Sequence, residues 1–329
     1  MQTILTEARR SWPRLGRSGL ILMALLLGLL LSGFKSSAAL QPPVADVLRL
    51  GAWNIEWLGQ PSRREEALPQ NPEDIAKYLM HSGCQVVGVM EVSWNIDTAE
   101  GPGNLTLLEA LRIIKERTDQ EWKHVLFPKE ASADRDQLCG VAWNASRVQR
   151  QDGPWSIPVF RPRAEAECWR RHPYATQFSA GPGKTDFTLI VVHMKSNRGG
   201  PEITGRTRDA EALSLVRALG AVQNRFKDED LIIAGDSNCL KASERAVQRF
   251  IHGGFRHLNE ADMTTWIKSR EFPAAPFDRF FVPEQRPAFA QSQQHVLTTH
   301  HLGDEAAFRR LLSDHYLIYT ELRVLPDDD

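Results

Sequence analysis

Short apolar segments of strand length recur from residue 47 almost to the end of the chain, and helical segments separate them. Strands are predicted at residues 47–55, 85–92, 138–143, 187–193, 231–234, 277–282 and 315–324. Amphipathic periodicity predicts helices at residues 72–83, 105–117, 206–226 and 243–251. No repeat or linker divides this pattern, so we expect one domain over residues 46–325 and an acidic tail at residues 326–329. An α/β architecture of two packed sheets with helices outside accommodates this order.

Five of the apolar strands close on a carboxylate, an amide or an imidazole, and the last strand opens on such a pair. Each of these residues taken alone is equally well explained as a turn former or a solvated strand end. If the strand ends converge at one edge, they form a site of hard oxygen ligands, which suits Mg²⁺, Mn²⁺ or Ca²⁺ better than zinc. Two imidazoles would add acid–base capacity near neutral pH. The residues are Asn54, Glu56, Glu91, His193, Asp236, Asn238, Asp278, Asp314 and His315.

Six short motifs contain these residues, and each resembles a motif of the deoxyribonuclease I-like endonuclease/exonuclease/phosphatase superfamily. They occur in the family's order and span essentially the whole chain beyond the N-terminal segment. Each motif alone has low specificity, whereas six in the correct order are a specific signal. The resemblance implies the family's four-layer α/β/β/α sandwich of two mixed sheets and a metal-dependent hydrolysis of phosphoric esters. The motifs are Trp-Asn-Ile-Glu at 53–56, Met-Glu-Val at 90–92, Val-His-Met-Lys-Ser at 192–196, Gly-Asp-Ser-Asn at 235–238, Phe-Asp-Arg-Phe at 277–280 and Ser-Asp-His-Tyr at 313–316.

The resemblance implies that Glu91 is the principal ligand of a divalent metal ion, with Asn54 and Asp314 completing the site. Mg²⁺ is the expected cofactor, with Mn²⁺ or Ca²⁺ as alternatives, because the ligands are oxygens. The cation would neutralise charge that builds up on the phosphoryl group in the transition state. Glu56 resembles the additional acidic ligand of the abasic-site endonuclease branch and would strengthen this site or admit a second ion.

The resemblance assigns acid–base chemistry to four residues. Asp236 would position or deprotonate the attacking water. His315, oriented by Asp278, and His193 would supply the general base and the general acid. The sequence leaves open which histidine has which role. The presence of His193 separates this chain from the abasic-site branch, which has no histidine at that position.

Two residues are expected to contact the substrate phosphate. Asn238 would donate a hydrogen bond to a phosphate oxygen. Arg171 stands where the family places a phosphate-contacting arginine, a task that suits a bidentate guanidinium, with a solvated arginine as the alternative. Gln137 falls where related enzymes have a glutamate that supports the first histidine, so His193 would lack its usual carboxylate partner.

The first 39 residues resemble an export signal. Four arginines precede an apolar run at residues 20–31, and small residues follow up to Ala39, where we expect cleavage. The run is shorter than the roughly 20 residues that span a bilayer comfortably, and an uncleaved anchor that extends through Phe34 is the alternative. Either interpretation places the domain outside the cytoplasm, as a periplasmic, secreted or membrane-anchored protein.

The charge balance argues against a protein that coats nucleic acid through bulk positive charge. The chain has 40 basic and 41 acidic residues, and residues 1–39 contain five of the basic residues and one of the acidic ones. The remaining 35 basic and 40 acidic residues give a formal charge of −5. That charge is compatible with an enzyme that grips one or two phosphates.

Three functions are open from the sequence. The leading hypothesis is a monomeric nuclease that hydrolyses phosphodiester bonds of DNA, with RNA as a second candidate substrate. The alternative is a phospholipid-directed phosphodiesterase or phosphatase, similar to a sphingomyelinase, and an exposed aromatic hairpin that would support membrane contact is not evident in the sequence. A catalytically inactive binding module is disfavoured because the metal-binding glutamate, both histidines and the Asp236–Asn238 pair are all present.

Overall fold

The computed structural model describes residues 47–60, 67–128, 137–162, 168–269 and 272–327. These described residues belong to one compact unit. The expected signal peptide or anchor and the last two residues of the acidic tail lie outside the described residues. Within the described ranges, none of the helices combines the length and the apolar character needed to cross a membrane.

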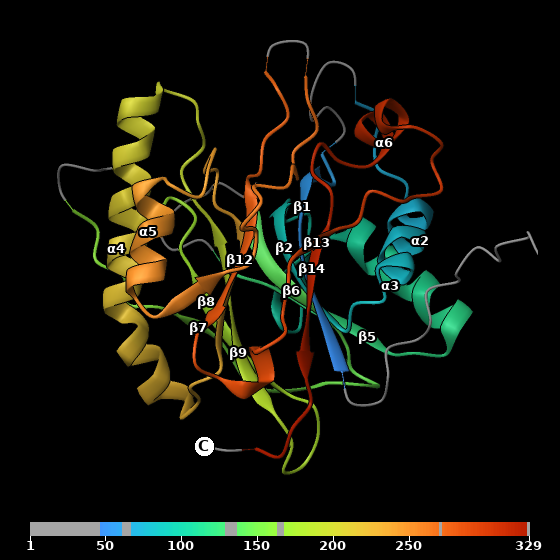
Figure 1. Cartoon of the computed structure of the whole chain (residues 1–329). Helices are drawn as coiled ribbons and strands as arrows, with labels where there is room; N and C mark the ends of the chain where they lie inside the picture. The colour runs from blue at the N-terminus through green and yellow to red at the C-terminus, as the bar shows by residue number, and fades with distance from the viewer. Residues whose placement is uncertain (1–46, 61–66, 129–136, 163–167, 270–271, 328–329) are drawn as a thin grey trace, which may run out of the picture. The chain divides into compact units, whose positions relative to one another are not determined.

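Two mixed sheets form the centre of the fold (Figure 1), each with six strands in the described part of the chain. In spatial order, the first sheet contains β13 (His295–Val296), β14 (Ile318–Arg323), β1 (Val47–Leu58), β2 (Val86–Val92), β6 (Leu138–Asn144) and β5 (Trp122–Leu126). β1 is parallel to β2 and antiparallel to β14. The carboxyl ends of β1 and β2 therefore meet at one edge of this sheet.

The second sheet is built around a parallel pair of strands, β9 and β10. In spatial order it contains β11 (Phe255–His257), β12 (Asp278–Pro283), β10 (Leu231–Asp236), β9 (Asp186–His193), β8 (Tyr174–Ser179) and β7 (Gln149–Ser156). β12 runs antiparallel to β10. The carboxyl ends of β9 and β10 consequently share an edge with the amino end of β12.

Helices cover the outer face of each sheet and lie on opposite sides in Figure 1. The helices are α2 (Pro72–Ser82), α3 (Leu105–Thr118), α4 (Pro201–Phe226), α5 (Arg245–His252) and α6 (Glu305–Leu311), with a 3-10 turn at Pro287–Phe289 and a small hairpin of β3 (Ile96–Thr98) and β4 (Gly101–Gly103). Apolar side chains of α2, α3 and α6 share one buried cluster with β1 and β2, and those of α4 and α5 share another with β9 and β10. The four layers are those of the predicted α/β/β/α sandwich.

Local sequence sets the boundaries of α2 as expected for a capped helix. The side chain of Asn71 accepts a hydrogen bond from the backbone N–H of Glu73, and Pro72 occupies the first helical position. Gly83 ends the helix with φ of 65°, a left-handed conformation that costs glycine little.

The two sheets pack face to face on an apolar core. On β1, Leu50 and Ala52 point into this core, whereas Trp53 belongs to the cluster beneath the helices, as the period of two in a strand requires. A Cβ on Gly88 of β2 would lie 2.9 Å from Cγ2 of Val191 on β9. The sheets therefore approach closely at this point. All four cysteines are buried, and no disulfide joins them.

Several predicted boundaries are wrong. α4 begins at Pro201 rather than near residue 206, because proline is compatible with the first helical turn. The last strand begins at Ile318 rather than at residue 315, because His315 forms an isolated bridge with Trp266 outside the sheet. β5, β7, β8 and α6 are absent from the prediction, and β7 in particular is a half-exposed edge strand without apolar alternation.

Candidate active site

Three strands of the second sheet place polar residues in one row. His193 ends β9 and Asp236 ends β10, whereas Asp278 begins β12 instead of closing it as predicted. β12 is antiparallel to β10, so its first residue lies at the same edge. The strand register pairs His193 with Asp236 and Asp236 with Asp278. All three side chains are buried. The row lies at the edge where the carboxyl ends of the parallel strands meet.

Asn54 of β1 joins the two sheets at this edge. Its Nδ2 donates hydrogen bonds to Oε1 of Glu91, at 3.2 Å, and to Oδ2 of Asp236, at 3.1 Å. Its Oδ1 accepts the backbone N–H of Glu56 at 3.0 Å. One buried amide thus holds a carboxylate of the first sheet next to a carboxylate of the second.

The backbone leaves the ordinary strand conformation at two predicted metal ligands. Glu56 has φ of 47° and Glu91 has φ of 60°, values that are uncommon for residues with a side chain. The register between β1 and β2 shifts between Asn54 and Leu58. Strain of this kind persists where the surrounding structure holds it, and Glu56 is held by a 3.1 Å hydrogen bond from the backbone N–H of Asp314 to its Oε2.

His315 and Asp278 form a buried pair. Nδ1 of His315 lies 2.7 Å from Oδ2 of Asp278. Burial favours the neutral imidazole, but the adjacent carboxylates of Asp278 and Asp236 outweigh it and raise the pKa of His315 well above its usual value. The other ring nitrogen, Nε2, lies 3.9 Å from Oδ2 of Asp236 and 3.9 Å from Oδ1 of Asp314. The orientation of this imidazole is therefore fixed by Asp278, and its Nε2 faces Asp236 and Asp314.

His193 approaches Asp236 from the opposite side of the row. Its Nε2 lies 3.5 Å from Oδ2 of Asp236 and 3.6 Å from Oε1 of Glu91. Asp236 Oδ2 is consequently the atom on which both imidazoles and the amide of Asn54 converge.

Like charges are concentrated in this site. Burial and then the neighbouring carboxylate of Asp314 raise the pKa of Glu91 to about 7. Burial also raises the pKa of Asp236, and the carboxylate of Asp278 adds to the shift. Several buried carboxylate oxygens beside an amide are a donor set that suits a hard divalent cation, because bound Mg²⁺ or Mn²⁺ would relieve their mutual repulsion.

Asp314, the remaining predicted ligand, contacts a loop that the sequence did not implicate. Its Oδ2 accepts the indole N–H of Trp266 at 3.1 Å. The neighbouring residue, Thr265, donates its hydroxyl to Oδ2 of Asp278 at 2.7 Å and accepts the backbone N–H of Asp278 at 2.9 Å. Thr265 is therefore a site residue that sequence reasoning missed, since it belongs to no recognisable motif.

Asn238 and Arg171, the predicted phosphate contacts, both bond to the segment that follows His193. Nδ2 of Asn238 donates to the carbonyl oxygen of Met194 at 3.2 Å. Nε of Arg171 donates to the carbonyl oxygen of His193 at 3.0 Å, and its Nη2 donates to that of Met194 at 2.5 Å. Gln137 lines a small cavity beside Arg171. The structure thus uses two of the guanidinium nitrogens of Arg171 to hold backbone near the site.

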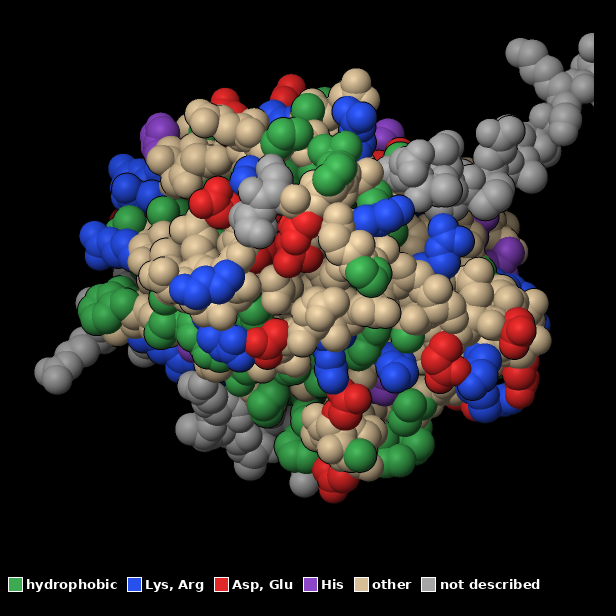
Figure 2. Space-filling model, turned by 90° about the horizontal axis from the view of Figure 1, so that it is seen from below, with side chains coloured by type: hydrophobic (Ala, Val, Ile, Leu, Met, Phe, Trp, Pro, Cys, Tyr) green, Lys and Arg blue, Asp and Glu red, His purple; other side chains and the backbone are tan. Residues whose placement is uncertain are grey.

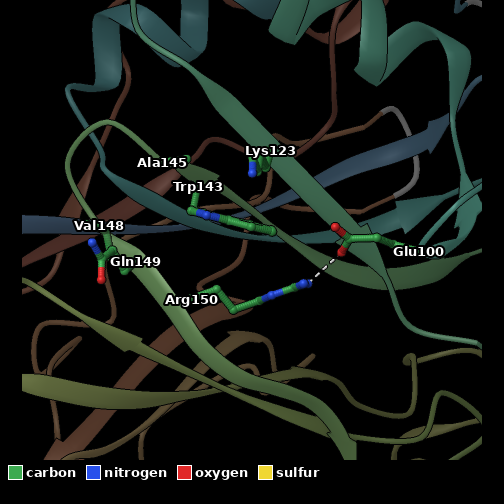
Figure 3. A pocket seen from close by; sticks show the side chains of 7 residues that line it. All are labelled: Glu100, Lys123, Trp143, Ala145, Val148, Gln149 and Arg150. Carbon is green, nitrogen blue, oxygen red and sulfur yellow. Dashed lines mark ion pairs between the residues drawn. The ribbon is translucent and has the colours of Figure 1, made fainter.

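A pocket of about 310 Å³ lies outside this site. It is lined from the edge strands β5 and β7, from β6 and from the hairpin of β3 and β4 (Figure 3). Arg150 reaches across it to Glu100 at 2.8 Å and lies over the ring of Trp143, 5.0 Å from the ring centroid. This ion pair and cation–π contact join β7 of the second sheet to the β3–β4 hairpin and to β6 of the first sheet.

No family model and no curated protein matches the sequence, whereas the fold has clear counterparts among solved structures. An endonuclease/exonuclease/phosphatase family protein of Bacteroides thetaiotaomicron matches with a TM-score of 0.58 and 17% identity, over 86% of this chain and 99% of the other. A mannosyl-6-phosphatase of the same organism gives 0.57 and 16%, over 84% and 99% of the two chains. The catalytic domain of human Nocturnin, solved with a sulfate anion, gives 0.56 and 15%, over 88% and 100%. The chain therefore has the fold of the endonuclease/exonuclease/phosphatase superfamily.

Proposed function

We propose that this protein is a divalent-metal-dependent phosphodiesterase, and that its substrate is nucleic acid, with DNA as the first candidate and RNA as the second. One observation carries the proposal. The Asp278–His315 pair and His193 approach Oδ2 of Asp236 from opposite sides, and Asn54 ties that carboxylate to Glu91.

The residues of the site have separate roles in acid–base catalysis. Asp278 fixes the tautomer and orientation of His315, so that Nε2 of His315 faces Asp236 and can accept or return a proton there. Asp236 would orient the attacking water, because its Oδ2 is shared by both imidazoles. His193 would exchange a proton at its Nε2 with the leaving oxygen or with the water.

The donor set supports a metal position on the first-sheet side of the site. Asp236, Asp278 and His315 offer ligand atoms within 4.8 Å of one another, but Asp278 and His315 bond each other. The metal would therefore be held by Glu91, with Asp314 and Glu56 beside it. Asn54, whose Nδ2 donates to Glu91 and whose Oδ1 accepts from the backbone of Glu56, would orient Glu91. A bound Mg²⁺, Mn²⁺ or Ca²⁺ supplies Lewis-acid neutralisation of the phosphoryl charge.

The surface charge favours local phosphate recognition over a broad electrostatic track. The chain has 40 basic and 41 acidic residues and so no overall excess of positive charge. Figure 2 shows basic and acidic side chains interspersed on the lower face of the molecule, away from the carboxyl ends of β1 and β2. Among the structural counterparts, Nocturnin was solved with sulfate, a tetrahedral oxyanion, and another is a mannosyl-6-phosphatase. The bound sulfate of one counterpart and the phosphatase activity named for the other support a site for a phosphoryl group. A phosphate monoester is therefore included among the test substrates.

A phospholipid substrate is the second candidate, favoured by one specific observation. The large hydrophobic side chains that are exposed in the described residues lie on connections or first helical turns. Phe272, the aromatic tip of the connection that precedes β12, is 62% exposed. The others are Leu68, Leu105, Phe160, Ile203 and Leu240.

We propose further that the domain works outside the cytoplasm, on the basis of the N-terminal apolar segment. Fractionation of cells expressing the full chain, followed by N-terminal sequencing, tests this point. Mature protein that starts at Leu40 in the periplasm or medium supports a cleaved signal, and an intact chain in the membrane fraction supports an anchor. Intact chain in the cytoplasm contradicts export.

The catalytic proposal is tested with purified residues 40–329. Plasmid DNA, RNA, sphingomyelin vesicles and mannose 6-phosphate are each incubated with Mg²⁺, Mn²⁺, Ca²⁺ or EDTA, beside a His315→Ala variant. Metal-dependent nicking of plasmid that His315→Ala abolishes is the expected result. Hydrolysis of the lipid alone, which Phe272→Asp reduces, would replace the nuclease with the second candidate. Inactivity towards every phosphoester would overturn the proposed function.

A further inference from the structure

α4 carries a buried polar pair that faces the back of the site. Arg208 is 2% exposed and Glu211 is 1% exposed, and they lie one turn apart on this helix. Charged side chains are seldom this buried unless their hydrogen-bonding groups are engaged. Their partners are the two chain segments that follow β9 and β10, together with the backbone of Trp169.

Glu211 holds the segment after β9. Its Oε2 accepts the backbone N–H of Lys195 at 2.8 Å, and its Oε1 accepts that of Trp169 at 2.9 Å. With the hydrogen bonds from Arg171 to the carbonyl oxygens of His193 and Met194, the backbone just beyond His193 is bonded on both sides.

Arg208 joins this segment to the one after β10. Its Nη1 donates to the carbonyl oxygen of Lys195 at 3.2 Å and to Oδ1 of Asn197 at 3.1 Å, and its Nη2 donates to Oε2 of Glu244 at 2.9 Å. Glu244 in turn accepts the backbone N–H of Leu240 at 2.6 Å. A single guanidinium therefore bridges the two post-strand segments.

Asn197 closes the connection directly behind the site. Its Nδ2 donates to the carbonyl oxygen of Asn238 at 2.9 Å. Asn238 in turn donates its backbone N–H to Oδ1 of Asp236 at 2.9 Å. The path from Arg208 to Asp236 thus runs through Asn197 and Asn238 alone, with hydrogen bonds at every step.

We propose that Arg208 and Asn197 are positioning residues, which set the spacing between His193 and Asp236 by locking the segments after β9 and β10 together. The same geometry makes Arg171 a third member of this group, because its Nε and Nη2 donate to the His193 and Met194 carbonyls. A displacement of about 1 Å at a reacting group can lower a rate by about 100-fold, so small changes in this spacing carry a large cost. The inference rests on the proposed hydrolase function for its kinetic readout.

The test compares Asn197→Ala and Arg208→Lys with Arg249→Gln. Arg249 pairs with Asp209 at 2.8 Å and also ties α5 to α4, but its side chain is 42% exposed and its guanidinium hydrogen bonds go to Asp209. Bis(4-nitrophenyl) phosphate with Mg²⁺ is the substrate, and thermal unfolding is measured for every variant. We expect kcat to fall by about 10-fold or more in Asn197→Ala and Arg208→Lys, with KM within twofold and Asn197→Ala unfolding at the wild-type temperature. Arg249→Gln keeps the wild-type kcat.

Wild-type kcat in both Asn197→Ala and Arg208→Lys overturns the inference, as does a loss that only follows the fraction unfolded. Arg171→Lys separates the two roles of that residue, since positioning lowers kcat and phosphate contact raises KM. Hydrogen–deuterium exchange over residues 187–200 gives a readout that needs no activity. Faster exchange there in Asn197→Ala, with no change elsewhere, supports the inference even if wild type hydrolyses nothing, and unchanged exchange refutes it.

Discussion

Nδ1 of His315 lies 2.7 Å from Oδ2 of Asp278, and both side chains are buried. Asp278 therefore decides which nitrogen of His315 carries the proton and where the other nitrogen points. Asp278→Asn keeps the shape but replaces the carboxylate, so we expect kcat to fall by about 10²–10⁴-fold with Mg²⁺ and a saturating diester. Asp186→Asn, at the opposite end of β9, is the control and should remain within twofold of wild type. Equal rates for Asp278→Asn and wild type would show that the pair has no catalytic role.

Asn54 is expected to govern metal affinity, because it holds Glu91 and Asp236 at a fixed separation. Asn54→Ala should weaken Mg²⁺ or Mn²⁺ binding by about 10–100-fold, the usual effect of losing a residue that orients metal ligands. Isothermal titration calorimetry at pH 7.5 measures it. Asn144→Ala removes another buried asparagine from the first sheet and should leave metal affinity unchanged. An unaltered dissociation constant in Asn54→Ala would place the metal elsewhere.

Glu91 makes stability and metal binding depend on pH. Its pKa is raised to about 7, first by burial and then by Asp314, so the folded protein favours the protonated carboxyl. The stabilisation that the folded protein gains from the protonated Glu91 carboxyl is fully present below about pH 4.5 and is lost as the pH rises to about 7. We therefore compare the unfolding temperatures of metal-free wild type and Glu91→Gln at each pH. The wild-type value minus the Glu91→Gln value should be lower at pH 8 than at pH 5.

Added Mg²⁺ should reverse this effect, because the cation competes with the proton for Glu91. The rise in unfolding temperature with Mg²⁺ is expected to be larger at pH 8 than at pH 5, and absent or small in Glu91→Gln. Differential scanning calorimetry at both pH values decides the point. A metal effect of the same size in Glu91→Gln would remove Glu91 from the ligand set.

Gly88 tests how tightly the two sheets pack. A Cβ at this position would lie 2.9 Å from Val191, so Gly88→Ala should lower the free energy of unfolding by about 1–3 kcal/mol. Gly220→Ala is the matched control, because a Cβ there meets no atom within 4 Å in the middle of α4, and alanine stabilises a helix interior by up to about 1 kcal/mol. Urea denaturation should show the two substitutions moving in opposite directions; a shift in the same direction for both would contradict the packing argument.

The fold was predictable from sequence because its strands are apolar on one or both faces and its helices are amphipathic. The alternation of Leu50 and Ala52 with Trp53 on β1 illustrates this signal. β7 was not predictable, because an edge strand with partly exposed residues needs no apolar pattern. α6 was missed because seven residues carry too little periodicity.

Some residues of the candidate site were also predictable from the sequence, and others were not. His193, Asp236, Asp278 and His315 follow from motifs at strand ends, and the strand register explains why such residues meet. Thr265, Arg208 and Glu211 belong to no motif, and only the folded chain brings them to the site. The direction of Arg171 also depends on tertiary hydrogen bonds, which an alignment position does not specify.

The hydrogen bond from Asn54 to Asp236 connects the two halves of the sandwich. Neither sheet contains a complete set of reacting groups, since Glu91 belongs to one and both imidazole-facing aspartates belong to the other. Any loosening of the interface between the layers would separate the metal ligands from the acid–base groups while each sheet stayed intact. The catalytic rate would therefore depend on how closely the two sheets pack. Under pressure or after a core mutation, the rate would fall before secondary structure is lost.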